Sequence, residues 1–192
     1  MSSRGTLMGN RGGRFHRDDR TLGSRQYASR QWIACVCDFK RRQRNVWGVG
    51  YTELFFLDEV TALAAGHRPC FECRQADAKA FAALFPFRPD EAVKAGDIDR
   101  RLHVERLNGK TKRTFSFQTG GLPEGAMFTR NGVAYAIRAQ QHLRWSHTGY
   151  EPAGVVSGAV DVLTPPAIIA ILQRGYRPRW HESVTAFTPQ LR

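Results

Sequence analysis

The chain has 192 residues, of which 42% are hydrophobic and 11% aromatic, so it can bury a real core and wholesale disorder is excluded. Lys and Arg total 29 against 17 Asp and Glu, which gives a formal net charge of +12. No apolar run approaches the ~20 residues that span a bilayer, and the first residues lack the apolar stretch of a secretory signal. We therefore expect a cytoplasmic protein, with nucleoid association as an option, and no membrane partner.

The positive charge is concentrated in the first quarter of the chain. Residues 1–50 hold 11 Lys and Arg and 3 acidic residues, so they carry +8, and the other 142 residues carry +4. A basic segment of this kind indicates a polyanionic partner, most commonly a nucleic acid. A solubilising surface or a patch for anionic membranes is the alternative.

Residues 1–30 alternate arginines with glycines and show no hydrophobic period, so we expect a basic arm or loop layer instead of a core element. The next segment, 31–39, alternates like a strand, and 48–57 reads as a returning strand, which predicts a β-hairpin with a basic turn. Arginines and lysines of these segments are candidates for phosphate contacts. They are Arg11, Arg14, Arg17, Lys40, Arg41, Arg42, Arg44 and, further on, Arg68.

Three helices follow in the predicted order of elements. The first covers 59–65, with Asp58 as N-cap and Gly66 just past its end. The second covers 72–85, a loop fills 85–96, and Asp97 caps a third helix over 98–107.

From residue 112 the pattern changes to strands at 112–118, 126–130, 133–139, 142–146 and 160–163. Asn131-Gly132 between two of them predicts a type I′ hairpin turn. A last helix begins at the prolines of TPPAIIAILQRG and ends at Gly175. We therefore predict an α+β fold with a small antiparallel sheet or partial barrel and a C-terminal helix. We divide it into an arm (1–30), a cysteine-bearing region (31–95) and a mainly β region (96–192), the last two of which can form one domain.

Four cysteines occur as Cys35-x-Cys37 and Cys70-x-x-Cys73. Residues i and i+2 of a strand share a face, so Cys35 and Cys37 can approach one ion, and Cys70 and Cys73 lie where a turn leads into a helix. Four thiolates from a hairpin and a helix start suit a tetrahedral zinc site. His67 or His16 is the alternative fourth ligand if one of the first pair is an ordinary buried cysteine.

The segment FFLDEVTALAAGHRPCFECR resembles the zinc-binding module of the Ada-type DNA-repair methyltransferases, and the resemblance covers about residues 35–74. It implies that Cys70 and Cys73 match the second ligand pair of that module and that Cys35 and Cys37 stand for the first. It also implies zinc and DNA as partners, DNA before RNA, in repair or regulation. The first pair is spaced Cys-x-Cys, and the Cys-Pro-Trp stretch, the helix-turn-helix and the Pro-Cys-His-Arg active site are missing. Methyl transfer is therefore not part of the expectation.

The leading hypothesis is thus a zinc-stabilised nucleic-acid-binding protein. The alternative is an enzyme that acts on nucleic acid, such as a nuclease or a base-processing repair enzyme, with His103, Glu105, His142 and His147 as weak catalytic candidates. A third hypothesis is a zinc-containing interaction protein whose basic arm binds an acidic protein or ribosomal RNA. We find no nucleotide-binding glycine loop, nucleophile elbow or HExxH pattern.

Overall fold

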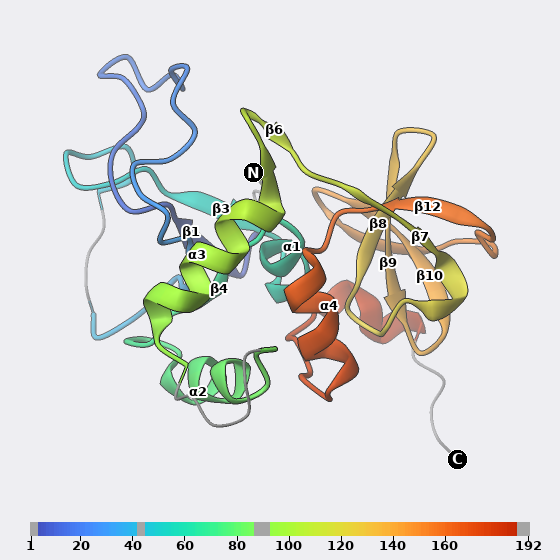
Figure 1. Ribbon diagram of the computed structural model, residues 1–192. Coiled ribbons are helices and arrows are strands. Elements are labelled where there is room, and N and C mark those ends of the chain that lie inside the picture. The colour runs from blue at the N-terminus through green and yellow to red at the C-terminus, as the bar shows by residue number, and fades with distance from the viewer. Residues whose placement is uncertain (1–3, 42–44, 87–92, 188–192) are drawn as a thin grey trace.

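The computed structural model describes residues 4–41, 45–86 and 93–187, and Figure 1 shows its two main sheets side by side. The first sheet has four strands in the order β3-β1-β2-β4. Their bounds are β1 Leu7–Asn10, β2 Ile33–Val36, β3 Leu54–Phe56 and β4 Arg68–Pro69. β1 is antiparallel to both of its neighbours, and β4 runs parallel to β2.

The position of β1 corrects two expectations. The stretch 1–30 is not confined to an arm, because Leu7 and Met8 are 4% and 2% exposed in the middle of the sheet. The strands at 33–36 and 54–56 do not form a hairpin, because β1 lies between them and pairs with both. Four residues are too few to show a period in the sequence, so local pattern could not reveal this strand.

Helix α1, Glu59–Ala64, confirms the predicted caps. Asp58 accepts a hydrogen bond from the Thr61 N–H at 2.9 Å, and Thr61 Oγ1 accepts one from the Asp58 N–H at 3.1 Å. Gly66 has φ +82°, where glycine escapes the penalty of a Cβ, and its carbonyl accepts from Arg106 at 2.9 Å. A Cβ at Gly66 would lie 2.7 Å from the Arg106 side chain.

The other helices are α2 Gln75–Ala83, α3 Ala95–Arg106 and α4 Pro166–Gln173. The predictions for the starts of α3 and α4 differ in outcome. α4 starts at its proline, as expected, whereas α3 starts three residues before the predicted position. Asp97 is therefore not the N-cap of α3. It lies in the first turn and accepts from the Lys94 N–H at 3.3 Å.

The second sheet is antiparallel, with six strands in the order β11-β10-β9-β8-β12-β7. Their bounds are β7 Phe115–Gln118, β8 Met127–Arg130, β9 Val133–Arg138, β10 Gln141–Ser146, β11 Gly149–Pro152 and β12 Ala159–Val162. The β8–β9 turn has φ +52° at Asn131 and +76° at Gly132, which confirms the predicted hairpin. A short pair, β5 Leu107–Asn108 and β6 Thr111–Lys112, leads into this sheet, and 3-10 turns cover Thr119–Gly121 and Glu182–Phe187.

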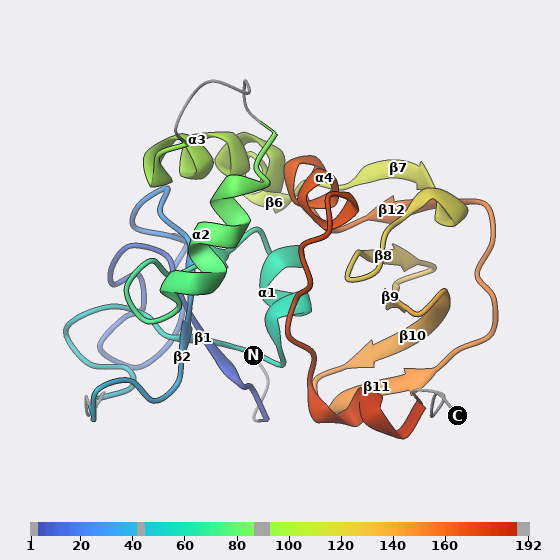
Figure 2. The same cartoon turned by 90° about the horizontal axis from the view of Figure 1, so that it is seen from below.

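The predicted α+β class, the small antiparallel sheet and the C-terminal helix are confirmed. Figure 2 shows α1 and α4 between the two sheets. One hydrophobic cluster joins Phe81 of α2 and Leu102 of α3 to Phe128 of β8 and Ile168 of α4, each at most 1% exposed. The core therefore crosses the boundary drawn near residue 95. No helix within the described ranges is long and apolar enough to cross a membrane.

Candidate metal centre and nucleic-acid interface

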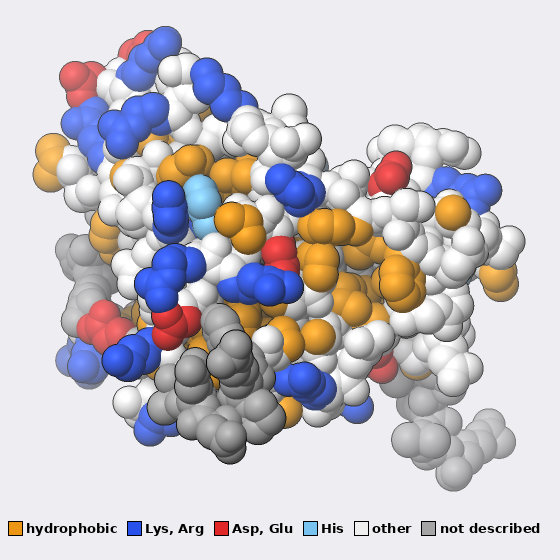
Figure 3. Space-filling view, in the orientation of Figure 1, with side chains coloured by type: hydrophobic (Ala, Val, Ile, Leu, Met, Phe, Trp, Pro, Cys, Tyr) orange, Lys and Arg blue, Asp and Glu red, His pale blue; other side chains and the backbone are white. Residues whose placement is uncertain are grey.

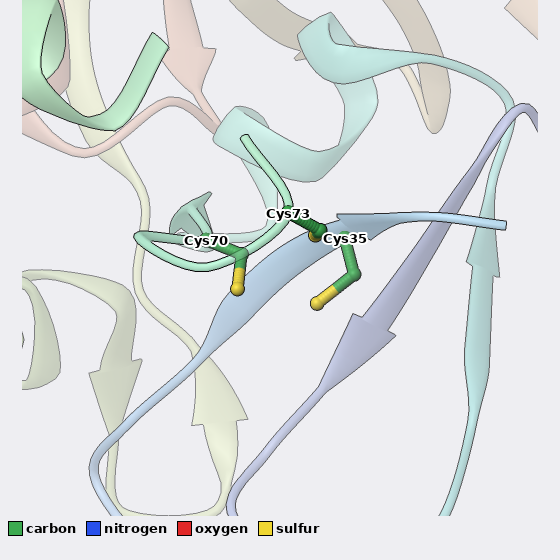
Figure 4. A group of neighbouring side chains, drawn as sticks. All are labelled: Cys35, Cys70 and Cys73. Carbon is green, nitrogen blue, oxygen red and sulfur yellow. The ribbon is translucent and has the colours of Figure 1, made fainter. Parts of the chain in front are cut away.

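Three of the four cysteines meet at one edge of the first sheet. The sulfur atoms of Cys35, Cys70 and Cys73 lie within 4.8 Å of one another. In Figure 4 Cys70 and Cys73 come from the turn that follows β4, and Cys35 comes from β2. Zinc–sulfur bonds measure about 2.3 Å, so small side-chain rotations would bring all three sulfurs onto one ion. The donor set therefore fits a soft-ligand metal such as zinc.

Backbone hydrogen bonds hold this turn against β2. The Cys70 N–H donates to the Ala34 carbonyl at 3.1 Å, one residue before Cys35. The Arg74 N–H then donates to the Cys70 carbonyl at 3.0 Å, and the Glu72 N–H points at the Cys70 sulfur at 3.4 Å. The turn thus directs backbone N–H groups toward sulfur, an arrangement that favours a thiolate.

The thiol pKa values agree with this geometry. Hydrogen bonding from Cys35, supported by the N–H groups of Cys73 and Glu72, lowers the pKa of Cys70 to about 5. The hydrogen bond to Cys70, together with burial, raises the pKa of Cys35. Burial also raises the pKa of Cys73. One thiolate is therefore favoured at neutral pH, and a divalent cation would favour the other two.

Cys37 lies outside the three-thiol group and is exposed. Its thiol donates to the Gly5 carbonyl at a sulfur–oxygen distance of 3.9 Å. The expected common face depended on a strand through residue 39, but β2 ends at Val36, so the alternation stops before Cys37.

Neither histidine considered as a fourth ligand joins the group among the described residues. His67 is fully buried against Trp32 and Phe56, and its Nε2 accepts from Arg11 at 3.4 Å. Burial and the nearby arginines hold the pKa of His67 well below its usual value. The Nδ1 of His16 is 2.8 Å from the Thr52 hydroxyl.

Arg68 is engaged inside the protein instead of on its surface. The side chain is 2% exposed and forms a two-pronged ion pair with Asp99, with both nitrogen–oxygen distances at 2.9 Å. This finding corrects its assignment as a phosphate contact.

The other candidate phosphate contacts have varied surroundings. Arg14 pairs with Asp18, while Arg17, Lys40 and Arg41 are exposed. Arg42 and Arg44 lie outside the described residues. Figure 3 shows Lys and Arg side chains gathered over the N-terminal loops and α3, beside a more hydrophobic area over the second sheet.

A pocket of about 460 Å³ collects five cationic side chains, and we call it the cationic pocket. No Asp or Glu of the described ranges lines it. The cations come from the N-terminal loop, the end of α3 and the β5–β6 hairpin. They are Arg11, Arg25, Arg106, Lys110 and Lys112, of which Arg106 is fully buried and contributes its charge but no direct contact with a ligand.

Trp32 lines the cationic pocket and contacts two of these cations. The guanidinium groups of Arg11 and Arg106 lie 3.7 Å and 3.9 Å from the centre of its indole ring. Such cation–π contacts fix a guanidinium without neutralising it. Burial lowers the pKa of Arg11 to about 10 and that of Arg106 to about 9, so both remain charged at pH 7.

A second pocket, of about 370 Å³, adjoins the first and lies between the two sheets against α1. We call it the apolar pocket, because its walls are mainly aliphatic and aromatic. The walls include Phe56 of β3, Met127 of β8, Trp145 of β10 and His147 just after β10. The two pockets share Arg11, Leu54, Ala65 and Lys112.

The four weak catalytic candidates are held in separate contacts. Glu105 accepts from the Ala167 N–H at 2.8 Å at the start of α4. His103 packs edge-on against Tyr27, and its Nδ1 is 3.3 Å from an Arg106 nitrogen. His142 accepts from the Val156 N–H at 2.9 Å.

The fourth candidate, His147, packs edge-on against Trp145 with ring centres 4.8 Å apart. It is the one of the four that lines the apolar pocket.

Sequence reasoning did not single out Arg25, Arg106, Lys110, Lys112 or Trp32. These residues come from separate segments and meet through the tertiary fold, so no local spacing links them. The only signal in the sequence was the general excess of arginine before residue 50, which includes Arg25.

Comparison of the chain with protein families, with curated proteins and with solved structures gave no match.

Proposed function

We propose that the protein is a zinc-stabilised nucleic-acid-binding protein directed at DNA. The observation that carries the proposal is the cationic pocket, in which five cations, four of them with exposed or half-buried side chains, line one concavity without a carboxylate among the described residues. Phosphate groups are the anions that such a cluster suits best, because arginine and lysine contacts to phosphate supply most nucleic-acid affinity. The Ada-like segment supports DNA before RNA.

Zinc in this proposal has a structural part. Cys35, Cys70 and Cys73 would supply three thiolates, and bound zinc would fasten the turn after β4 to β2. Binding of the metal then contributes to the free energy of folding, since no such site exists in the unfolded chain. The same turn leads from Arg68 to α2, so the metal would fix the surroundings of the first sheet.

Metal content is tested by elemental mass spectrometry of the purified protein. We expect about one zinc per chain, with the metal lost in Cys35→Ser, Cys70→Ser and Cys73→Ser. Cys37→Ser is the matched control and should keep the zinc, because Cys37 lies outside the three-thiol group. A metal-free wild-type protein that unfolds cooperatively would contradict the structural role of zinc.

Nucleic-acid binding is tested by measuring Kd for DNA and RNA oligonucleotides over a range of salt concentrations. We expect log K to fall steeply with log salt, with a slope of about −0.9 per phosphate neutralised on duplex DNA. Arg25→Ala and Lys110→Ala should each reduce that slope by about one. Arg177→Ala removes a charge that is also exposed but lies outside the pocket, and it is the control. A slope near zero would refute the proposal, and tighter binding of RNA would overturn the DNA preference.

A further inference from the structure

The two pockets together combine the two chemistries of a nucleotide. The cationic pocket offers charge for phosphate, and the apolar pocket offers a mainly hydrophobic wall beside it. They adjoin through four common residues, of which Arg11 and Lys112 are cationic. A ligand that fills both must carry an anionic part and an apolar part in direct succession.

The wall of the apolar pocket favours a flat ring. Phe56, Trp145 and His147 contribute three aromatic side chains from both sides of the gap between the sheets. Its volume of about 370 Å³ lies within the range of about 300–1,000 Å³ that small-molecule sites occupy. Stacking on such side chains is how proteins hold single bases, and it works for every base because each has a π-face.

Charge complementarity favours an anionic ligand over a hydrocarbon. Arg11 and Lys112 line the apolar pocket as well as the cationic pocket, so charge lies beside the aromatic wall. Among the described residues no carboxylate lines the apolar pocket to repel an adjoining phosphate.

We infer that the apolar pocket receives the base of one unpaired nucleotide while the cationic pocket holds the neighbouring phosphates. This inference rests on the proposed function and names its substrate class, a single-stranded or locally unpaired stretch of DNA. A paired base stays stacked inside the duplex and cannot reach a concave pocket unless it leaves the stack. The protein should therefore discriminate by base accessibility.

Fluorescence anisotropy at one fixed salt concentration tests this with four labelled DNAs. They are a single strand, a fully paired duplex, a duplex with one unpaired nucleotide, and the last duplex with an abasic residue in place of the unpaired nucleotide. We expect binding about tenfold tighter to the unpaired nucleotide than to the abasic residue, because the two DNAs carry the same phosphates and differ in one stacking base. A free mononucleotide serves as competitor.

Pocket variants connect that preference to the structure. Trp145→Ala removes an aromatic wall, and Ala134→Leu adds side-chain volume inside the pocket. Each should bring the two Kd values within about twofold of each other while leaving the salt dependence unchanged. Phe117→Ala is the matched control, since this side chain is 44% exposed on β7 and lines neither pocket. Circular dichroism checks that each variant is folded.

The outcomes separate the two proposals. Equal affinity for unpaired and abasic DNA, with a steep salt slope, would overturn the base pocket and leave nucleic-acid binding in place. A protein that binds no DNA but binds a fluorescent mononucleotide, which an unlabelled mononucleotide then displaces, would refute the proposed function. The site would then be one for free nucleotides. Preserved discrimination in both Trp145→Ala and Ala134→Leu would also overturn the assignment of this pocket.

Discussion

Lys112 lines both the cationic pocket and the apolar pocket, so its ammonium group lies between a charged and a hydrophobic surface. Partial removal of its ammonium from water, with added repulsion from Arg106 and Arg11, lowers its pKa to about 8. A lysine in water titrates near 10.4. Between these two values the folded protein binds fewer protons than the unfolded chain, so the contribution of Lys112 to stability rises with pH.

Anion binding at Lys112 should follow the opposite course. The ammonium is protonated at pH 7 and mostly neutral at pH 9, so DNA affinity should fall over this interval. Anisotropy titrations of wild type and Lys112→Met at pH 7 and pH 9 measure the effect. We expect weaker binding at pH 7 and a flatter profile in the variant. An unchanged pH dependence in Lys112→Met would exclude this lysine as the responsible group.

At the scale of elements, α1 controls where Arg106 is held. The helix ends at a glycine with positive φ, whose carbonyl accepts from the Arg106 guanidinium. The same guanidinium also donates to the Arg30 carbonyl at 2.6 Å and so joins α3 to the N-terminal loop. The end of a six-residue helix thus fixes one cation of the cationic pocket.

Gly66→Ala should destabilise the protein and weaken DNA binding. The positive φ alone costs about 1–2 kcal/mol with a Cβ, and contact with the Arg106 side chain adds to that. Gly175→Ala is the matched control, because its φ is +103° but its Cβ would meet nothing within 4 Å. Chemical denaturation should show the larger loss for Gly66→Ala, and binding should change in that variant alone. Equal losses would show that Arg106 moves aside at no cost.

Elements with a local signature could be predicted, and those defined by distant partners could not. α1 carries its own cap and terminating glycine, and the Asn131-Gly132 turn specifies its hairpin. β1 has no such signature, since its place depends on pairing with strands about 25 and 45 residues away. The predicted start of α3 lies three residues too late, because an aspartate fits both the N-cap and the first turn of a helix.

At the scale of the whole molecule, the shared core joins the cysteine-bearing half to the six-stranded sheet. Phe81 of α2 packs edge-on against Tyr176, with ring centres 5.5 Å apart, and in a tilted arrangement against Phe85. The hydroxyl of Tyr176 donates to Glu59 of α1 at 2.6 Å. Contacts of this kind favour unfolding of both halves in one transition.

Phe81→Ala should lower the free energy of unfolding by about 3–5 kcal/mol, because it leaves a cavity in that shared core. Denaturation followed by tryptophan fluorescence and by circular dichroism should give coincident curves before and after the change. Phe117→Ala, at an exposed position, should cost far less. Two separated transitions in the wild-type protein would show that the halves unfold independently.

The candidate site could be predicted where its residues have a local spacing and not where they come from distant segments. The Cys-x-x-Cys spacing predicts that Cys70 and Cys73 share a site, and Cys35 lies with them as expected. The predicted inclusion of Cys37 is wrong because it required a longer strand than β2. The cationic pocket needed the tertiary fold to bring its five cations together.

The central place of β1 also bears on how the protein would meet DNA. The arginine-rich segment after it is tied down at both ends by β1 and β2, and backbone bonds to the Arg11 carbonyl close it further. A flexible tail can bind a DNA strand at a distance before the folded part arrives, which accelerates association. A closed loop cannot do so. Encounter would then require the whole molecule to arrive in the right orientation, guided by its long-range positive field, with its arginines already ordered on arrival.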